Sequence, residues 1–270
     1  MIINGIQIQK DIIQTLKNTI QSHPYILDII YVGENAVIEK YINAKRKLGE
    51  VLGVQTRIHR FSDTVDLETL KHTIQDISLD SSGIIIQLPL PDTLQKENIM
   101  EYIDPSLDID ILTHEAYDRF IHQKNNRLPT VLRACLYIKD THDISFENKN
   151  ICILGAGKLV GAPIAQWCKL QGLSYTQLTK ENFNTDTLKQ ADIIFSGMGV
   201  PHMITADMVK DGVIVFDAGT SEESGSVVGD MHPDVAIKAA LFTPVPGGIG
   251  PLTVTALFHN MIENYESRTL

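Results

Sequence analysis

The stretch ICILGAGKLVGAP, residues 151–163, decides the fold. Four apolar, β-favouring residues are followed by Gly155, Gly157 and Gly161, where a helix-like segment begins. Small residues at such a turn let backbone N–H groups approach a pyrophosphate, and the helix N-terminus adds partial positive charge. The third glycine comes one position later than in GxGxxG. The stretch therefore predicts a dinucleotide-binding turn, with a ligand-free strand-to-helix turn as the alternative.

The next expected strand, LSYTQL (173–178), is followed by Lys180 and Glu181. A lysine there suits the 2′-phosphate of NADP, whereas a glutamate suits the ribose hydroxyl of NAD. The two residues therefore predict opposite cofactor preferences, and either could equally be a solvated loop charge.

Strand-length and helix-length segments alternate along the whole chain. Because a parallel strand pair needs a crossover of a dozen or more residues, this alternation predicts an α/β fold with parallel sheets and helices on both faces. GIIIQLPLP (83–91) is a continuous apolar run stopped by prolines, which predicts a buried central strand rather than an edge strand. The polar stretch 140–150 is expected to link two α/β domains.

Composition excludes several classes of protein. The 270 residues carry 23 Lys plus Arg against 33 Asp plus Glu, a net charge of −10. That acidic excess argues against a nucleic-acid or anionic-membrane binder. Scattered histidines without metal-ligand spacing predict no metal site, and no GxSxG or Walker sequence occurs.

The location is expected to be cytoplasmic. Cys135, Cys152 and Cys168 form no CxxC pair, which favours a reducing compartment. The N-terminus has no secretory pattern, and no apolar run approaches the roughly 20 residues that span a bilayer.

Tyr41 and Lys45 in EKYINAKRK are four residues apart, so on a helix they project from one face. A tyrosine ring beside an amine suits a planar heteroaromatic substrate. The alternative is an aromatic core residue beside a surface lysine.

Four blocks in this order resemble the methylenetetrahydrofolate dehydrogenase/cyclohydrolase family: YVGENAVIEKYINAKRK, GIIIQLPLP, GKLVGAP and TPVPGGIGPLT. With GDM at 229–231 they extend over nearly the whole chain. The resemblance implies two α/β domains flanking a cleft. Residues 1–139 with a C-terminal helix at 252–270 would bind folate, and residues 140–251 would form a Rossmann-like, doubly wound parallel sheet. It also implies a homodimer.

The resemblance implies oxidation of 5,10-methylenetetrahydrofolate with a nicotinamide dinucleotide, then hydrolysis to 10-formyltetrahydrofolate. Its catalytic and substrate-binding residues match Tyr41, Lys45, Gln87 and Asp110, with Lys45 exchanging protons and Gln87 holding it. Asp108 competes with Asp110, and Gln87 could instead cap backbone groups.

The rigid loop 244–251 is expected to line the cleft through Pro246, Gly247 and Gly248, or to be only a structural turn. A cis peptide is possible in this loop. The cofactor-binding residues implied are Gly155, Ala156, Gly157, Lys158, Val160, Gly161, Pro163, Lys180 and Gly199.

Three departures from the family pattern matter. Ile111 replaces a glycine after Asp110, and PTVLRA (129–134) replaces a PCTP-like segment, which together predict a reshaped substrate pocket. Ala156 replaces an arginine that would grip a 2′-phosphate, so NADP is favoured only slightly and NAD is possible. The alternatives are a member with one activity, a folate- or nucleotide-binding homologue without turnover, or a dehydrogenase of amino or hydroxy acids.

Overall fold

The structure, a computed structural model, describes residues 1–20, 24–91, 94, 98–124, 126–223 and 225–269. The chain divides into two compact units. The N-terminal unit comprises Asp11–Thr130 with Val254–Leu270, and the central unit comprises Met1–Lys10 with Val131–Thr253. Each unit contains a parallel sheet with helices, which confirms the predicted α/β class.

The units differ from the expected bounds of 1–139 with 252–270, and 140–251. Residues 1–10, 131–139 and 252–253 belong to the central unit. The first residues join it because Ile2 forms a parallel bridge with Phe242, and the Ile3 N–H donates to the Phe242 carbonyl at 2.8 Å. The segment after 130 joins it as a helix, on which the Lys139 ammonium lies 6.0 Å from the Phe146 ring centroid.

The first part of the chain forms α1 (Gly5–Ile20), β1 (Ile26–Val32), α2 (Ala36–Leu52), β2 (Gln55–Phe61), α3 (Leu67–Ile77), β3 (Gly83–Ile86), the 3-10 helix η1 (Ile99–Tyr102), α5 (His114–Ile121) and α6 (Thr130–Thr141). The second part forms β4 (Ile151–Leu154), α7 (Gly161–Leu170), β5 (Tyr175–Leu178), α8 (Thr185–Gln190), β6 (Ile193–Ser196), η2 (Ala206–Met208), β7 (Ile214–Asp217), β8 (Ser221–Glu223), β9 (Ser226–Val228), α9 (Val235–Lys238), β10 (Leu241–Phe242) and α10 (Ile249–Thr269).

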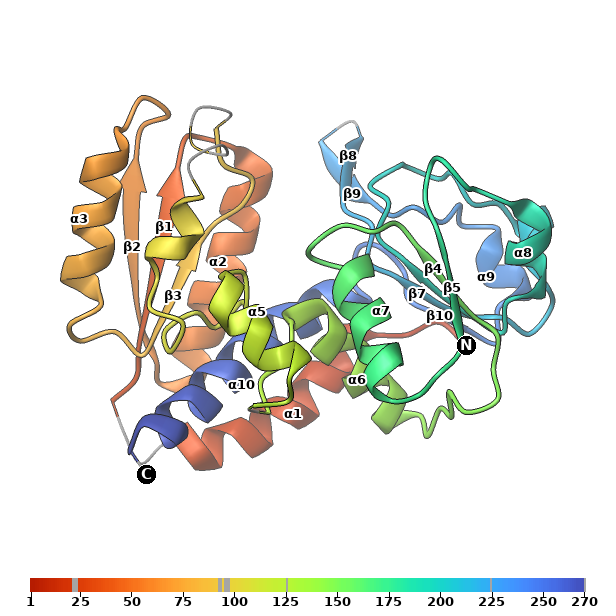
Figure 1. Ribbon diagram of the computed structural model, residues 1–270, viewed down its shortest axis with the longest axis horizontal. Coiled ribbons are helices and arrows are strands. Elements are labelled where there is room, and N and C mark those ends of the chain that lie inside the picture. Colours follow the sequence, from red (N-terminus) through yellow and green to blue (C-terminus); the bar gives the residue numbers. More distant parts are fainter. Residues whose placement is uncertain (21–23, 92–93, 95–97, 125, 224, 270) are drawn as a thin grey trace. The chain divides into compact units, whose positions relative to one another are not determined.

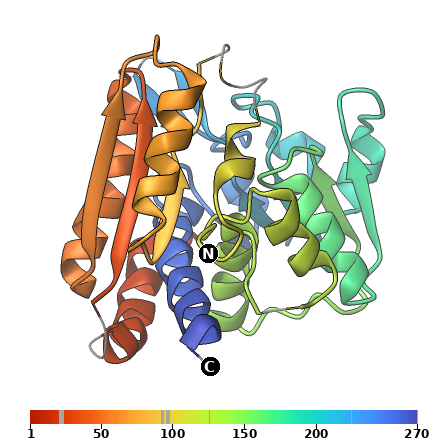
Figure 2. The same cartoon turned by 60° about the vertical axis from the view of Figure 1, so that its left-hand side comes forward.

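The sheet of the N-terminal unit has the order β2-β1-β3, and all its pairs are parallel (Figure 2). Helix α3 covers one face and α2 the other (Figure 1). Alternate side chains of β1 point to opposite faces of the sheet: Leu27 and Ile29 pack with α2 and α10, and Ile30 packs with α3. The sheet therefore has an apolar core on each side.

The prediction that residues 83–91 form a central strand was wrong. Among the described residues, β3 lies at the edge of the sheet and pairs with β1. Its four residues are nevertheless buried, because Ile84 bridges to Asp108 and its N–H donates to the Leu107 carbonyl at 2.8 Å. An irregular segment thus covers the edge where another strand was expected.

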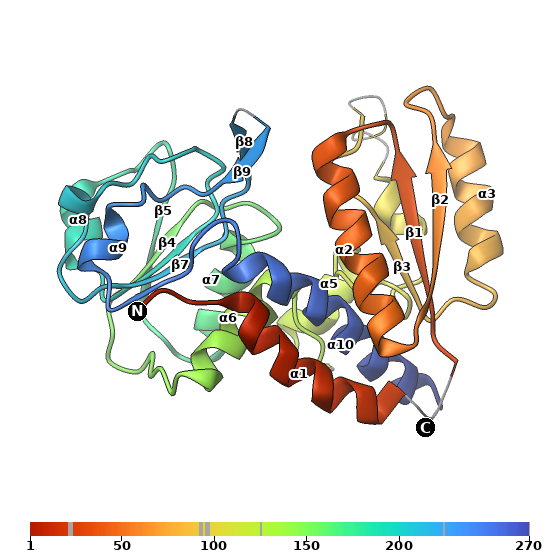
Figure 3. The same ribbon diagram turned by 180° about the vertical axis from the view of Figure 1, so that it is seen from behind.

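The sheet of the central unit has the order β10-β7-β6-β4-β5, and all its pairs are parallel. Helices α8 and α9 lie on one side of it and α7 on the other (Figure 3). Strand β5 lies beside β4 on one side, and the next strand in sequence, β6, lies beside β4 on the other side. The strand order therefore reverses between β4 and β6, as in a doubly wound fold.

The three cysteines are buried, free thiols in the central unit. Burial raises the pKa of Cys152 and of Cys168 to about 12, so both remain protonated at neutral pH. None of the described helices combines the length and the apolarity that crossing a bilayer requires.

Candidate active site

Helix α2 carries the tyrosine and lysine that the sequence singled out. The Asn35 side chain caps its N-terminus by accepting from two backbone N–H groups, and Gly53 ends it in the left-handed conformation at φ 77°. Tyr41 is half-buried, and only 7% of Lys45 is exposed. The alternative of a surface lysine was therefore wrong.

Lys45 reaches the residue that follows β3. Its Nζ donates a hydrogen bond to Gln87 Oε1 at 2.7 Å, and Gln87 Nε2 donates to the Leu88 carbonyl at 2.7 Å. Gln87 thus both holds the amine and caps a backbone group. Burial lowers the pKa of Lys45, and the negative charge of Asp110 partly opposes that change. The amine is therefore closer to neutrality than a solvated lysine.

The contacts of Asp108 and Asp110 distinguish these two residues. The buried carboxylate of Asp108 accepts three backbone N–H groups, from Ile111, Leu112 and Thr113, each at 2.8 Å. Asp108 therefore holds its own turn. Asp110 is half-buried, accepts from Thr130 Oγ1 at 2.8 Å and acts electrostatically on Lys45. Asp110 belongs with Lys45 and Gln87.

Ile111 has a left-handed backbone with φ of 59° and is 3% exposed. A β-branched residue is disfavoured there by roughly 1–2 kcal/mol, which explains why a glycine fits the position. The hydrogen bond from its N–H to Asp108 and the burial of its side chain offset that cost.

Three residues that support the aspartate turn were missed by the sequence analysis. Thr130, in the PTVLRA segment, bonds Asp110. Arg127 Nη1 donates to the carbonyls of Pro105 and Asp108, and Asn260 of α10 donates to the carbonyls of Ile109 and Leu128. Only the departure at 129–134 pointed to any of them, because the other contacts join segments remote in sequence.

In the central unit, the residues expected to bind a dinucleotide lie at the carboxyl ends of β4, β5 and β6. The Gly155 N–H donates to the Leu178 carbonyl at 2.8 Å, and Gln177 Nε2 donates to the Gly155 carbonyl at 3.0 Å. These bonds join the glycine turn to the end of β5. Open α/β sheets bind ligands where the strand order reverses, which here is between the turn after β4 and the loop after β6.

The three glycines of the turn differ in what requires them. A Cβ built on Gly161 would lie 2.1 Å from the Gly155 carbonyl oxygen, and Gly155 itself has φ of 95°. The backbone therefore needs both. A Cβ on Gly157 would meet no heavy atom within 4 Å. The fold therefore does not require a glycine at 157, and the backbone there is open to the close approach of a ligand.

The other expected cofactor residues have distinct settings. Ala156 and Lys158 are exposed in the turn, and Pro163 is buried in α7. Val160 packs against Gly197, where an added Cβ would lie 2.5 Å from its side chain. Gly199, with φ of 68°, is exposed in the loop after β6.

Lys180 and Glu181 are both exposed in the loop after β5. Thr179 Oγ1 donates to Glu181 Oε2 at 2.5 Å, and this bond lowers the pKa of Glu181. Glu181 is therefore held as an anion in this loop.

Pro246, Gly247 and Gly248 lie in the central unit, whereas Tyr41, Lys45, Gln87 and Asp110 lie in the N-terminal unit. The Val245–Pro246 peptide is cis, and the Gly5 N–H donates to the Gly247 carbonyl at 2.8 Å. The loop therefore has a structural role in receiving the first residues of the chain. Its contact with folate stays a prediction.

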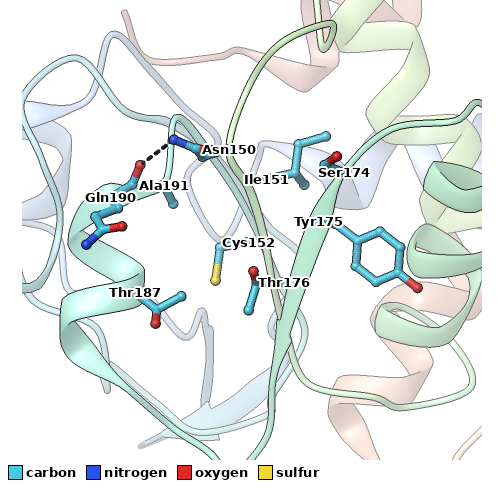
Figure 4. A pocket seen from close by; sticks show the side chains of 9 residues that line it. All are labelled: Asn150, Ile151, Cys152, Ser174, Tyr175, Thr176, Thr187, Gln190 and Ala191. Carbon is cyan, nitrogen blue, oxygen red and sulfur yellow. Dashed lines mark hydrogen bonds between the residues drawn. The ribbon is translucent and has the colours of Figure 1, made fainter.

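A pocket of the central unit lies at the amino ends of the strands β4 and β5, opposite the carboxyl ends that carry the candidate dinucleotide site (Figure 4). Its lining includes Asn150 and Ile151 where β4 begins, and Tyr175 where β5 begins. Ligands of open α/β sheets bind outside the carboxyl ends of the strands. This pocket is therefore separate from the candidate dinucleotide site.

Two family models match the chain. Residues 3–110 match the catalytic domain of tetrahydrofolate dehydrogenase/cyclohydrolase, and residues 129–269 match its NAD(P)-binding domain. The chain belongs to the tetrahydrofolate dehydrogenase/cyclohydrolase family. It is therefore a folate dehydrogenase/cyclohydrolase with an NAD(P)-binding domain, as the sequence blocks predicted.

Relatives of this folate enzyme include the bifunctional protein FolD of Mycoplasmopsis synoviae, which is 34% identical over 91% of each chain. FolD of Aquifex aeolicus is 31% identical over 99% of this chain and 96% of its own. The crystal structure of FolD from Campylobacter jejuni, methylenetetrahydrofolate dehydrogenase/cyclohydrolase, has a TM-score of 0.93 at 29% identity and covers 99% of both chains. These bifunctional relatives do not favour the alternatives of one activity, lost turnover or another dehydrogenase.

The contrast between Gly157 and Gly161 gives a test of the turn. Gly161→Ala is expected to lower the free energy of unfolding by about 1–3 kcal/mol, because the added methyl group overlaps the Gly155 carbonyl. Gly157→Ala should change the free energy of unfolding by less than about 0.5 kcal/mol. The same variant should raise the Kd of the dinucleotide about tenfold. Urea unfolding and calorimetric titration measure the two effects. Unchanged dinucleotide affinity in Gly157→Ala would contradict a close approach of the dinucleotide to this residue.

Proposed function

We propose that this enzyme oxidises 5,10-methylenetetrahydrofolate to 5,10-methenyltetrahydrofolate and hydrolyses the product to 10-formyltetrahydrofolate. The observation that carries the proposal is the buried Lys45 amine, bonded to Gln87 and influenced by Asp110, within the residues matched to the family's catalytic domain. Such an amine has the protonation behaviour that hydrolysis of the methenyl group needs.

In the hydrolysis, water adds to the methenyl carbon and loses a proton, and the bond from that carbon to N5 then breaks. Neutral Lys45 accepts the proton of the attacking water and returns it to N5 as the carbon–N5 bond breaks, while the hydroxyl on that carbon loses its proton to solvent and becomes the formyl carbonyl. Gln87 accepts one N–H of the amine through Oε1, which restricts the directions that the Nζ lone pair can take. The overall reaction releases one proton.

Asp110 is proposed to hold the aminopyrimidine edge of the pterin, since a carboxylate accepts two adjacent N–H donors. Its hydrogen bond from Thr130 supports this role by fixing the carboxylate. Tyr41, on the same helix face as Lys45, is proposed to stack against the substrate ring. Pro246, Gly247 and Gly248 are proposed to contact the substrate.

The dinucleotide is proposed to bind at Gly155, Ala156, Gly157, Lys158, Val160, Gly161, Pro163, Lys180 and Gly199. The bound dinucleotide would supply the hydride acceptor for oxidation of the methylene carbon. No heavy atom lies within 4 Å of a Cβ built on Gly157, so the backbone there is open to a pyrophosphate. The N-terminus of α7 has no side-chain cap, and its partial positive charge suits the negative charge of that group. NADP is the proposed cofactor, with NAD as the alternative. The crystal structure of FolD from Trypanosoma brucei is a complex with NADP. That protein is 25% identical to this chain, with a TM-score of 0.93 over 100% of this chain and 98% of its own.

A homodimer and a cytoplasmic location complete the proposal. The homodimer rests on the family resemblance, and the cytoplasmic location rests on the cysteine usage and the absence of a secretory pattern.

Lys45→Met is expected to lower the rate of methenyltetrahydrofolate hydrolysis by about 10²–10⁴-fold, because the proton acceptor is lost. Hydride transfer should fall less, since it depends mainly on the positions of the two rings. Both rates are followed by the absorbance of methenyltetrahydrofolate. Lys47→Met, which changes an exposed lysine on the same helix, is the control. Equal loss of the two activities in Lys45→Met would contradict a role in proton transfer.

Asp110→Asn is expected to shift the pH profile of hydrolysis toward lower pH. The negative charge of Asp110 raises the pKa of Lys45, so its removal lowers that pKa and the neutral amine forms at lower pH. The variant should also raise the KM for folate while leaving dinucleotide affinity unchanged. The profile is measured from kcat at each pH, with the exposed Asp104→Asn as control. An unmoved profile would exclude electrostatic coupling between the two residues.

Lys180→Ala and Glu181→Gln should change cofactor preference in opposite directions. Removing Lys180 is expected to lower the ratio of kcat/KM for NADP to that for NAD by about threefold to tenfold, and neutralising Glu181 should raise it similarly. The effects should shrink as salt is added, because both groups are exposed. Lys189→Ala on α8 is the matched surface change. Ratios equal to that of the unmodified enzyme would exclude both residues from the ribose site.

A further inference from the structure

Two buried carboxylates in the central unit have no part in the proposed chemistry. Asp217 ends β7 and is 1% exposed, and Asp230 in the GDM segment is 0% exposed. Among the described residues, neither forms an ion pair with a lysine or arginine. Burying an unpaired carboxylate is costly unless hydrogen bonds satisfy it, so the contacts of these two residues indicate what they stabilise.

Asp230 fixes the loop that follows β6. Its Oδ2 accepts from Ser196 Oγ at 2.6 Å and from the Met198 N–H at 2.7 Å, and its Oδ1 accepts from the Val200 N–H at 2.9 Å. One carboxylate therefore holds the end of β6 and both neighbours of Gly199. The fit is tight, since a Cβ on Gly219 would lie 2.5 Å from Asp230 Oδ1.

Asp217 in turn fixes the backbone that carries Asp230. Its Oδ1 accepts from the N–H groups of Gly219 at 2.9 Å and Asp230 at 3.2 Å, and its Oδ2 accepts from the Met231 N–H at 2.9 Å. A Cβ on Gly229 would lie 2.1 Å from Asp217 Oδ2, so the segment lies directly against the carboxylate. Contacts thus run from the end of β7, through the 229–231 segment, to the loop after β6.

That loop forms one side of the point where the strand order reverses. A Cβ on Gly155 would lie 2.7 Å from the Gly197 carbonyl oxygen, and Val160 packs against Gly197. The loop and the glycine turn therefore touch at their base. Above this contact, the exposed Gly199 and Gly157 border the place proposed for the dinucleotide.

We infer that Asp230 is a positioning residue for the dinucleotide, because its carboxylate holds the 197–200 loop in the conformation that borders the cofactor, and that Asp217 holds Asp230. The inference rests on the proposed dinucleotide site. Its effect should be confined to reactions that use the dinucleotide. Hydrolysis of methenyltetrahydrofolate consumes no dinucleotide, so the rate of hydrolysis in the same variant is a control for damage outside the dinucleotide site.

The test compares Asp230→Asn with Asp192→Asn. An asparagine at 230 cannot accept from all three donors, because one carboxylate oxygen becomes an NH₂ group. We expect the KM and the Kd for NADP to rise at least tenfold. The KM for methylenetetrahydrofolate and the rate of hydrolysis, measured without dinucleotide, should stay within about twofold. Asp192, which accepts from the Asn150 N–H and Lys210 at the amino end of β6, should leave all these values unchanged.

A milder variant guards against misfolding. Ser196→Ala removes one donor to Asp230 and should raise the KM for NADP by a smaller factor. Unchanged NADP affinity in folded Asp230→Asn, or a parallel loss of NADP affinity and hydrolysis in both variants, would overturn the positioning role. Failure of the proposed function is a separate outcome, since the unmodified enzyme would then bind no dinucleotide or form no methenyltetrahydrofolate.

Discussion

Parallel strand pairing is the constraint on which both candidate sites depend. Parallel strands have all their carboxyl ends on the same side of the sheet, and the loops that follow the strands are brought together there. In the central unit, the glycine turn after β4, Glu181 after β5 and Gly199 after β6 lie at these carboxyl ends. In the N-terminal unit the same arrangement places Gln87 directly after β3, where the buried amine of Lys45 on α2 meets it. The chemistry thus depends on side chains that connect helices to strand ends.

The parts of the fold that local pattern determines were predictable from the sequence. A four-residue apolar strand followed by Gly155 and Gly161 predicted the turn and its helix, because the backbone itself needs both glycines. The edge position of β3 was not predictable, since Leu107–Ile109 covers it through an irregular segment without strand periodicity. Asp108 and Asp110 could not be told apart either, because they differ only in which groups the folded chain brings to each.

The turn that contains Ile111 illustrates how one departure from a family pattern is accommodated. The sequence predicted that replacing the glycine would reshape the substrate pocket. The structure has an isoleucine in a backbone conformation that glycine would adopt without strain. Asp108 stabilises the turn with three hydrogen bonds, and Arg127 and Asn260 fix the carbonyls around it. Asp110 is therefore held by its surroundings as much as by its own sequence.

The division of the chain into units bears on the order in which they are completed during synthesis. Residues 11–130 leave the ribosome before residues 131–253 of the central unit, yet Val254, Phe258 and Met261 of α10 belong to the apolar core of the N-terminal unit. The central unit, in contrast, has all its residues once Thr253 has emerged. Nascent chains generally fold from the N-terminus onward. Here the unit that was translated earlier cannot complete its apolar core until the whole central unit has been translated.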